Sequence, residues 1–200
     1  MKIIAITGMP GSGKSETINY LKEKGIKAVV MREVVQREME EKGIAVDNKN
    51  LREYATDLRK KRGMDVVAKM CLPLIKRLSK DQRMILIDGV RGYNEVKLFK
   101  RELTEDFILV AIFASPKIRF KRLASRGEKW DMKTLKEFEW RDDVELSWGL
   151  GNAIALSDYM IDNSGSIEDL HKGIDKVVET IGQGNPPPHP PYKRSQHPHP

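Results

Sequence analysis

The residues between positions 8 and 15 are of the types that bind phosphate groups. They satisfy the pattern G-x-x-x-x-G-K-[ST], with the members Gly8, Met9, Pro10, Gly11, Ser12, Gly13, Lys14 and Ser15. Glycines let the backbone wrap tightly, so that successive N–H groups point at phosphate oxygens, and a following helix adds the positive end of its dipole. In such a loop the lysine reaches the β- and γ-phosphates and the serine hydroxyl ligates Mg²⁺. The sequence therefore predicts an ATP- and Mg²⁺-binding loop rather than a chance glycine turn.

A second group of polar residues follows the apolar run of residues 84–88. Asp88 ends that run, where a carboxylate can hold Mg²⁺ beside Ser15. The alternative for Asp88 is a simple cap at the end of a strand. Gly89 permits a close backbone approach, and Arg91 can form a bidentate pair with a phosphate. We therefore expect Asp88 at the metal and Arg91 on a phosphate-bearing ligand.

Arginines recur at helical spacing further along the chain. Arg119, Arg122 and Arg126 fall on one stripe of an expected helix. Kinases use such arginines to neutralise charge on the transferred phosphoryl group, and we assign Arg122 and Arg126 to this role. A solvated basic face is the alternative. Arg141, on the next expected helix, has two interpretations. Its side chain either contacts the bound phosphates or forms an internal ion pair.

The elements that must position these residues alternate between strands and helices. Short apolar strands are expected at residues 2–7, 28–31, 84–88, 107–114 and 158–162, and helices at 14–24, 34–42, 50–61, 67–78, 116–126, 132–148 and after Ser166. Pro73 should kink or restart its helix, because proline cannot donate its backbone hydrogen bond. The alternation predicts an α/β fold, with a five-stranded parallel sheet covered by helices on both faces.

Composition limits the class of protein further. The 200 residues suit one domain at 1–182, followed by a disordered Pro/His-rich tail at 183–200 whose prolines could dock a protein partner. The net charge of +7 is spread among acidic residues, without the aromatic–basic pattern that indicates nucleic acid binding. No apolar run of about 18 residues indicates a membrane span. The single cysteine, Cys71, excludes an internal disulfide and fits a reducing cytoplasm, with the residue buried in a helix.

The phosphate loop, the D-G-V-R turn and the order of elements resemble adenylate kinases and their relatives. This resemblance implies a P-loop NTPase fold of the nucleoside-monophosphate-kinase type with a short lid. In that family the matching arginine, here Arg91, binds the acceptor phosphate, and the position of Glu95 contacts the acceptor base. The family's G-D-x-x-R acceptor motif is matched only in part, with Glu33 for its aspartate and Arg37 one position beyond its arginine. Glu95 could instead be a helix-surface residue, and Glu33 and Arg37 a solvated pair.

The segment D-Y-M-I-D-N-S-G-S, residues 158–166, resembles the fifth strand of dephospho-coenzyme A kinases. Those kinases place a catalytic aspartate where this chain has Met31, which cannot accept a proton. Over residues 1–182 the chain resembles a mostly archaeal, adenylate-kinase-related family of P-loop proteins. The matching segments are A-S-P-K-I-R-F-K-R-L, W-G-L-G-N-A-I-A and D-G-V-R. Trp148, the first residue of the segment W-G-L-G-N-A-I-A, either shapes a pocket or ends a helix.

Two functions are compatible with these residues. The first is a Mg²⁺-dependent kinase that transfers the ATP γ-phosphoryl to a nucleotide-like or other phosphate-bearing small molecule, with the acceptor held by Glu33, Arg37, Arg91 and Glu95. The second is a nucleotide-gated switch or weak ATPase that acts through a protein partner. The acceptor site separates them, because a kinase needs a cavity beside the phosphate loop and a switch does not.

Overall fold

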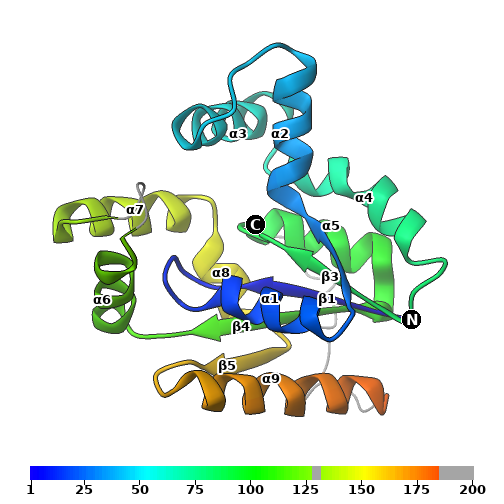
Figure 1. Cartoon of the computed structure of the whole chain (residues 1–200). Helices are drawn as coiled ribbons and strands as arrows, with labels where there is room; N and C mark the ends of the chain where they lie inside the picture. Colours follow the sequence, from blue (N-terminus) through cyan, green and yellow to red (C-terminus); the bar gives the residue numbers. More distant parts are fainter. Residues whose placement is uncertain (128–131, 185–200) are drawn as a thin grey trace, which may run out of the picture.

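The computed structural model describes residues 1–127 and 132–184 of the chain. Five strands in this part form one parallel sheet, in the order β2-β3-β1-β4-β5 (Figure 1). They are β1 (Lys2–Thr7), β2 (Lys27–Val30), β3 (Met84–Asp88), β4 (Phe107–Phe113) and β5 (Tyr159–Asp162). Because parallel strands end at the same edge of a sheet, the loops that follow β1, β3 and β5 all open at the carboxyl edge.

Helices cover both faces of this sheet, as the sequence predicts. Alternate residues of β1 point to opposite faces, so Ile4 and Ile6 pack with the helices of one layer and Ile3 and Ala5 with those of the other. The first layer holds α1 (Lys14–Glu23) and α9 (Ile167–Gly182), and the second holds α2 (Met31–Glu41), α3 (Asn48–Arg62), α4 (Val66–Leu78), α5 (Tyr93–Leu103) and α8 (Leu150–Ala155). The short 3₁₀ turn Thr104–Asp106 leads into β4.

The remaining helices stand at the carboxyl edge. α6 (Pro116–Arg126) follows β4, and α7 (Leu135–Ser147) follows α6. Figure 1 shows α2 and α3 rising from one part of the sheet, and α6 and α7 standing apart from them on another. The candidate functional residues come from the loops at this edge and from the helices of these two groups.

Several elements differ in their bounds from those expected from the sequence. Met31 opens α2 instead of closing β2. The helix expected at 132–148 is α7, which begins later, at Leu135, and Gly149, with a φ of 85°, separates it from α8, a helix that the sequence analysis did not predict. Of the two expectations for Pro73, a restart of the helix is wrong, because α4 continues through it as one helix. Cys71 lies in α4 and is fully buried, as predicted.

Two ranges of the chain lie outside the described part. The first is residues 128–131, between α6 and α7. The Pro/His-rich tail likewise lies outside it from residue 185 onward. Among the helices that the structure does describe, none has the length and apolar character needed to cross a membrane.

Candidate functional site

The predicted phosphate loop connects the end of β1 to the start of α1. Gly13 has a φ of 106°, and a Cβ atom there would collide with Nδ2 of Asn163. That amide nitrogen donates a hydrogen bond to the Ser12 carbonyl over 2.8 Å, so the loop after β5 braces the phosphate loop. Ser12 Oγ is buried and has no hydrogen-bond partner among the described residues. The positive-φ glycine and the unsatisfied hydroxyl fit a loop that receives phosphate oxygens.

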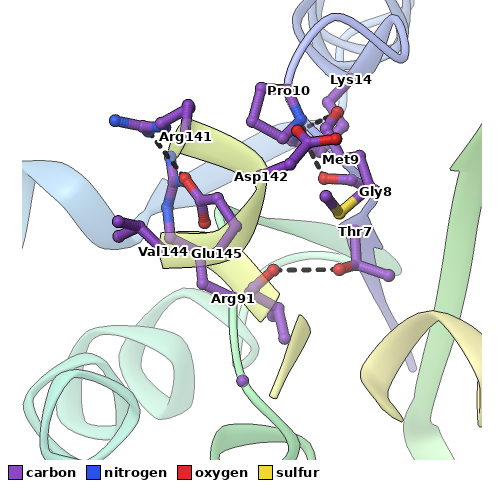
Figure 2. Close-up of polar contacts among 12 residues, drawn as sticks. Thr7, Gly8, Met9, Pro10, Lys14, Arg91, Arg141, Asp142, Val144 and Glu145 are labelled. Atoms are coloured by element: carbon purple, nitrogen blue, oxygen red, sulfur yellow. Dashed lines mark hydrogen bonds and ion pairs between the residues drawn. The ribbon is translucent and has the colours of Figure 1, made fainter. Parts of the chain in front are cut away.

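Lys14 folds back onto this loop. Its Nζ donates to the carbonyl oxygens of Gly8 at 2.6 Å and Met9 at 3.0 Å (Figure 2). Burial lowers the pKa of Lys14 to about 8, and the positive charge of Arg91 adds to this effect. An incoming phosphate would restore the full ammonium charge, because it supplies the negative partner that the carbonyls lack.

Asp88 lies beside the phosphate loop because β3 pairs directly with β1. Ile6 is its register partner, and Asp88 and Ser15 both line the same cleft. Burial raises the pKa of the Asp88 carboxyl, whereas the charges of Lys14 and Arg91 act in the opposite direction. A hydroxyl and a carboxylate are hard oxygen ligands of the kind that Mg²⁺ prefers, with phosphate oxygens and water completing its shell. Ser15 and Asp88 therefore fit a bound Mg²⁺.

A buried carboxylate on α7 holds Arg91. Glu145 Oε1 accepts a hydrogen bond from Arg91 Nη1 at 2.6 Å and another from Arg141 Nη2 at 2.7 Å (Figure 2). Glu145 is fully buried, which alone would raise its pKa, but Arg91 and Arg141 together lower the pKa below its usual value. Sequence reasoning missed Glu145, although its i,i+4 spacing from Arg141 was a signal for a helical ion pair.

The arginines of α6 have separate environments. Arg119 is buried and donates from Nη1 to Asp142 at 2.9 Å and to the Pro10 carbonyl at 3.0 Å, which joins α6, α7 and the phosphate loop. Arg122 Nη2 donates to the Asn163 carbonyl at 2.9 Å, and Arg126 lines the cleft. Of the two arginines assigned to the transferred phosphoryl group, Arg126 thus lies on the cleft wall and Arg122 lies against the loop after β5.

The cleft itself has a volume of about 480 Å³ and extends from the phosphate loop to α3. Its wall combines cations with apolar side chains. The cations are Lys14, Arg32, Arg52, Arg59, Arg91, Arg126 and Arg141, and Asp88 is the carboxylate among the lining residues. Trp148 also lines the cleft and is the C-cap of α7, so both interpretations of this residue hold. This charge balance suits anionic ligands.

Three expected acceptor residues lie elsewhere. The Glu95 carboxylate is fully buried, where it pairs with Arg59 Nη2 at 3.0 Å and accepts the Arg91 N–H at 2.8 Å. Its role as a base contact is therefore corrected to a structural one, which fixes the turn that carries Arg91. Glu33 and Arg37 are exposed on α2 and are not among the residues that line the cleft, because the face of α2 toward the core carries Met31 and Val35 instead.

Comparisons with known proteins agree with this geometry. A family model described as an AAA domain matches residues 4–142. The chain is 41% identical over 186 residues to a UPF0200 protein of Methanosarcina barkeri, a match that covers 93% of this chain and 99% of that relative. The chain belongs to the UPF0200 family. It is also 39% identical over 178 residues to a UPF0200/UPF0201 protein of Archaeoglobus fulgidus, which covers 89% of this chain and 55% of that longer relative.

Solved structures show the same fold as this UPF0200 protein. TT1252 from Thermus thermophilus matches with a TM-score of 0.61 and 20% identity, over 90% of this chain and 97% of that one. Dephospho-CoA kinase from Campylobacter jejuni matches with a TM-score of 0.59 and 16% identity, over 92% and 100%. Shikimate kinase from Acinetobacter baumannii matches with a TM-score of 0.56 and 14% identity, over 92% and 94%. The fold is therefore that of a kinase-like P-loop NTPase, a nucleotide-binding α/β fold.

Proposed function

We propose that this UPF0200 protein is a Mg²⁺-dependent kinase, which transfers the γ-phosphoryl of ATP to a phosphate-bearing small molecule. The observation that carries the proposal is the placement of Arg91 and Arg141 on the wall of the same cleft as Lys14 and Asp88. A nucleotide-binding loop alone would serve a switch equally well. A second group of cations facing the same cavity gives a second anion a place to bind.

On the donor side, the loop amides and Lys14 hold the β- and γ-phosphates. Ser15 and Asp88 would ligate Mg²⁺, whose charge offsets that of the phosphates. Arg126 lies on the wall of the same cleft and would neutralise negative charge on the phosphoryl group during its transfer. These residues bind and orient the donor, and they carry out no covalent chemistry themselves.

On the acceptor side, an oxygen of the acceptor phosphate forms the new bond to Pγ while the bond from Pγ to the bridging oxygen of ADP breaks. A fully ionised phosphate has no proton to lose, so the step needs no general base. This agrees with Met31, which is buried and lines the cleft at the position where the resembling dephospho-coenzyme A kinases place an aspartate. The absence of a base at this position favours a phosphate oxygen over a hydroxyl as the nucleophile.

The proposal is tested by incubating the protein with γ-labelled ATP, Mg²⁺ and a panel of phosphate-bearing compounds, including nucleoside monophosphates and sugar phosphates. We expect label to move to at least one of them, and Lys14→Ala to abolish the transfer. Matched compounds without the phosphate form the control panel. Transfer only to water, at a rate unaffected by every compound, would contradict the proposal.

A switch or weak ATPase is the second candidate, and one observation favours it. α2 brings no arginine of the resembling acceptor motif to the cleft, since Arg37 is exposed and away from it. A switch would hydrolyse ATP slowly, and small phosphate compounds would leave its rate unchanged. The same labelled-ATP experiment therefore distinguishes the two candidates.

A further inference from the structure

One arginine of the cleft is held differently from its neighbours. Arg59 pairs with Glu95, Arg91 and Arg141 pair with Glu145, and the buried Arg119 pairs with Asp142. Arg52 of α3 also lines the cleft, but within the described part of the chain it has no carboxylate partner. Its guanidinium lies over the ring of Trp140 of α7, 5.5 Å from the ring centroid. α3 and α7 thus meet through this residue.

We propose that Arg52 and Arg141 form an anion-binding subsite in the acceptor half of the cleft, which receives the phosphate of a phosphomonoester with an apolar body. This inference rests on the proposed kinase function, since it names the residues and the chemical class of its acceptor. It replaces Glu33 and Arg37 of α2, which the sequence analysis assigned to the acceptor together with Arg91 and Glu95, by residues of α3 and α7.

Unsatisfied donors are the first support. The Nε atoms of both Arg52 and Arg141 are buried and have no hydrogen-bond partner among the described residues. A buried donor without a partner is costly, and native structures retain one mainly where a ligand or water satisfies it. Two such donors, on residues that line one cleft, indicate that an anion with several acceptor oxygens belongs there.

Charge is the second support. Burial lowers the pKa of Arg52, and the negative charge of Glu145 only partly offsets this while Arg91 adds to it. Arg52 therefore lies within electrostatic reach of the Arg91–Glu145 pair. Glu145 is shared between Arg91 and Arg141, and the carboxylates of Asp88 and Glu95 also act on Arg91, but among the described residues none of the three forms an ion pair with Arg52, which is the cation in excess. A phosphomonoester carries a charge of about −1.5 to −2 at neutral pH and would balance the excess.

The surroundings of Arg52 indicate what the phosphate is attached to. Ala55 of the same helix and Val30 at the end of β2 line the cleft and are partly exposed, whereas Leu51, Val35 and Val67 also line it but belong to the buried core. These side chains carry no hydrogen-bonding groups, so the adjoining part of the ligand gains most by being apolar or aromatic. A bare phosphate or a compact polyol phosphate would leave this surface uncovered.

Calorimetric titration with phenyl phosphate tests the subsite in protein saturated with Mg·ADP, so that the phosphate loop is already filled. We expect phenyl phosphate to bind the wild-type protein, and Arg52→Ala to weaken binding by about 10- to 100-fold, as expected for one charge-assisted contact. Arg52→Lys should weaken binding less than Arg52→Ala, because lysine keeps the positive charge but cannot donate two parallel hydrogen bonds to the phosphate. Lys60→Ala, which removes an exposed cation of the same helix, is the matched control and should bind normally.

The inference is overturned if phenyl phosphate does not bind the wild-type protein, or if Arg52→Ala binds it as tightly as the wild type. Benzoate binding as tightly as phenyl phosphate would overturn the assigned class and indicate a carboxylate ligand. Because no phosphoryl transfer is measured, the result is independent of the kinase proposal. A protein that binds phenyl phosphate through Arg52 but phosphorylates nothing would refute the kinase and retain the subsite.

Discussion

The donor and acceptor halves of the cleft are built in different ways. The donor half is one continuous loop, residues 8–15, whose backbone and lysine make most of the expected contacts. The acceptor half draws Arg52 from α3, Arg91 from the turn after β3 and Arg141 from α7. A ligand site made from one loop is recognisable in a sequence, whereas a site made from three distant elements depends on how those elements pack.

The two halves also differ in how their cations are held. Lys14 contacts neutral carbonyl oxygens, which a phosphate can replace. Arg91 and Arg141 are held by the buried carboxylate of Glu145, so their positions are set before any ligand arrives. We therefore expect changes in the donor half to affect nucleotide binding, and changes in the acceptor half to affect stability or acceptor use.

Glu145→Gln should have the largest effect, and it should fall on stability. The amide keeps the shape of the side chain but removes the carboxylate that Arg91 and Arg141 share. The cost should be about 2–4 kcal/mol, below that of a fully enclosed pair because the Arg91 side chain is 34% exposed. A chain of this size should then melt about 4–16 °C lower. Glu139→Gln, at an exposed position of the same helix, is the control and should melt normally. Equal melting temperatures for both variants would show that the buried ion network does not stabilise the fold.

Lys14→Ala should lower ATP affinity by at least about 100-fold, because it removes a charge-assisted contact to two phosphates. The melting temperature without nucleotide should change little, since the lysine contacts only carbonyl oxygens among the described residues. Titration with Mg·ATP checks the first expectation, and Lys27→Ala, at an exposed position on β2, serves as the control. ATP binding of wild-type strength in Lys14→Ala would show that nucleotide binds elsewhere.

Asp88→Asn should lower phosphoryl transfer or ATP hydrolysis by about 10- to 100-fold and raise the Mg²⁺ concentration needed for half-maximal rate. The amide preserves the geometry at the end of β3 but loses the charge that holds the metal. Rates measured over a series of Mg²⁺ concentrations check this. An unchanged Mg²⁺ dependence would mean that Asp88 is a strand cap.

The smallest effect concerns pH and the donor half alone. Lys14 has a pKa of about 8 in the free protein, and bound phosphate raises it. Raising the pH therefore removes the proton from the free protein first, so Mg·ADP affinity should fall by about tenfold between pH 7 and pH 9. Lys14→Arg stays charged and should show a nearly flat profile over this range. A fall of the same size in Lys14→Arg would assign the titration to another group.

The sequence predicted the parallel sheet and the phosphate loop well. The apolar runs of β1, β3 and β4 indicated buried parallel strands, and the structure confirms that Ile85, Leu86 and Ile87 are fully buried. The loop of residues 8–15 could be found because its backbone requires glycines at fixed spacing. Each of these features depends on residues that are close together in the chain.

The acceptor half was predicted less well, because its residues depend on tertiary packing. Glu95 and Arg59 are 36 positions apart and Arg91 and Glu145 are 54 apart, so their pairing has no local pattern. The carboxyl edge of β3 did predict that Arg91 would reach the cleft. The buried Glu145 could not be distinguished from the exposed acidic residues of α7 without knowing which face of that helix meets the turn after β3.

Arg91→Ala tests the central claim most directly, since the claim is that one cleft holds a donor and a separate acceptor. ATP affinity and acceptor-dependent transfer should be measured on the same preparation. The account predicts that ATP affinity changes by less than about threefold, while acceptor use falls by about 10- to 100-fold, the loss expected for one charge-assisted phosphate contact. A loss of ATP binding would place Arg91 in the donor half, and unchanged acceptor use would remove it from the acceptor half. Either result would contradict the division of the cleft.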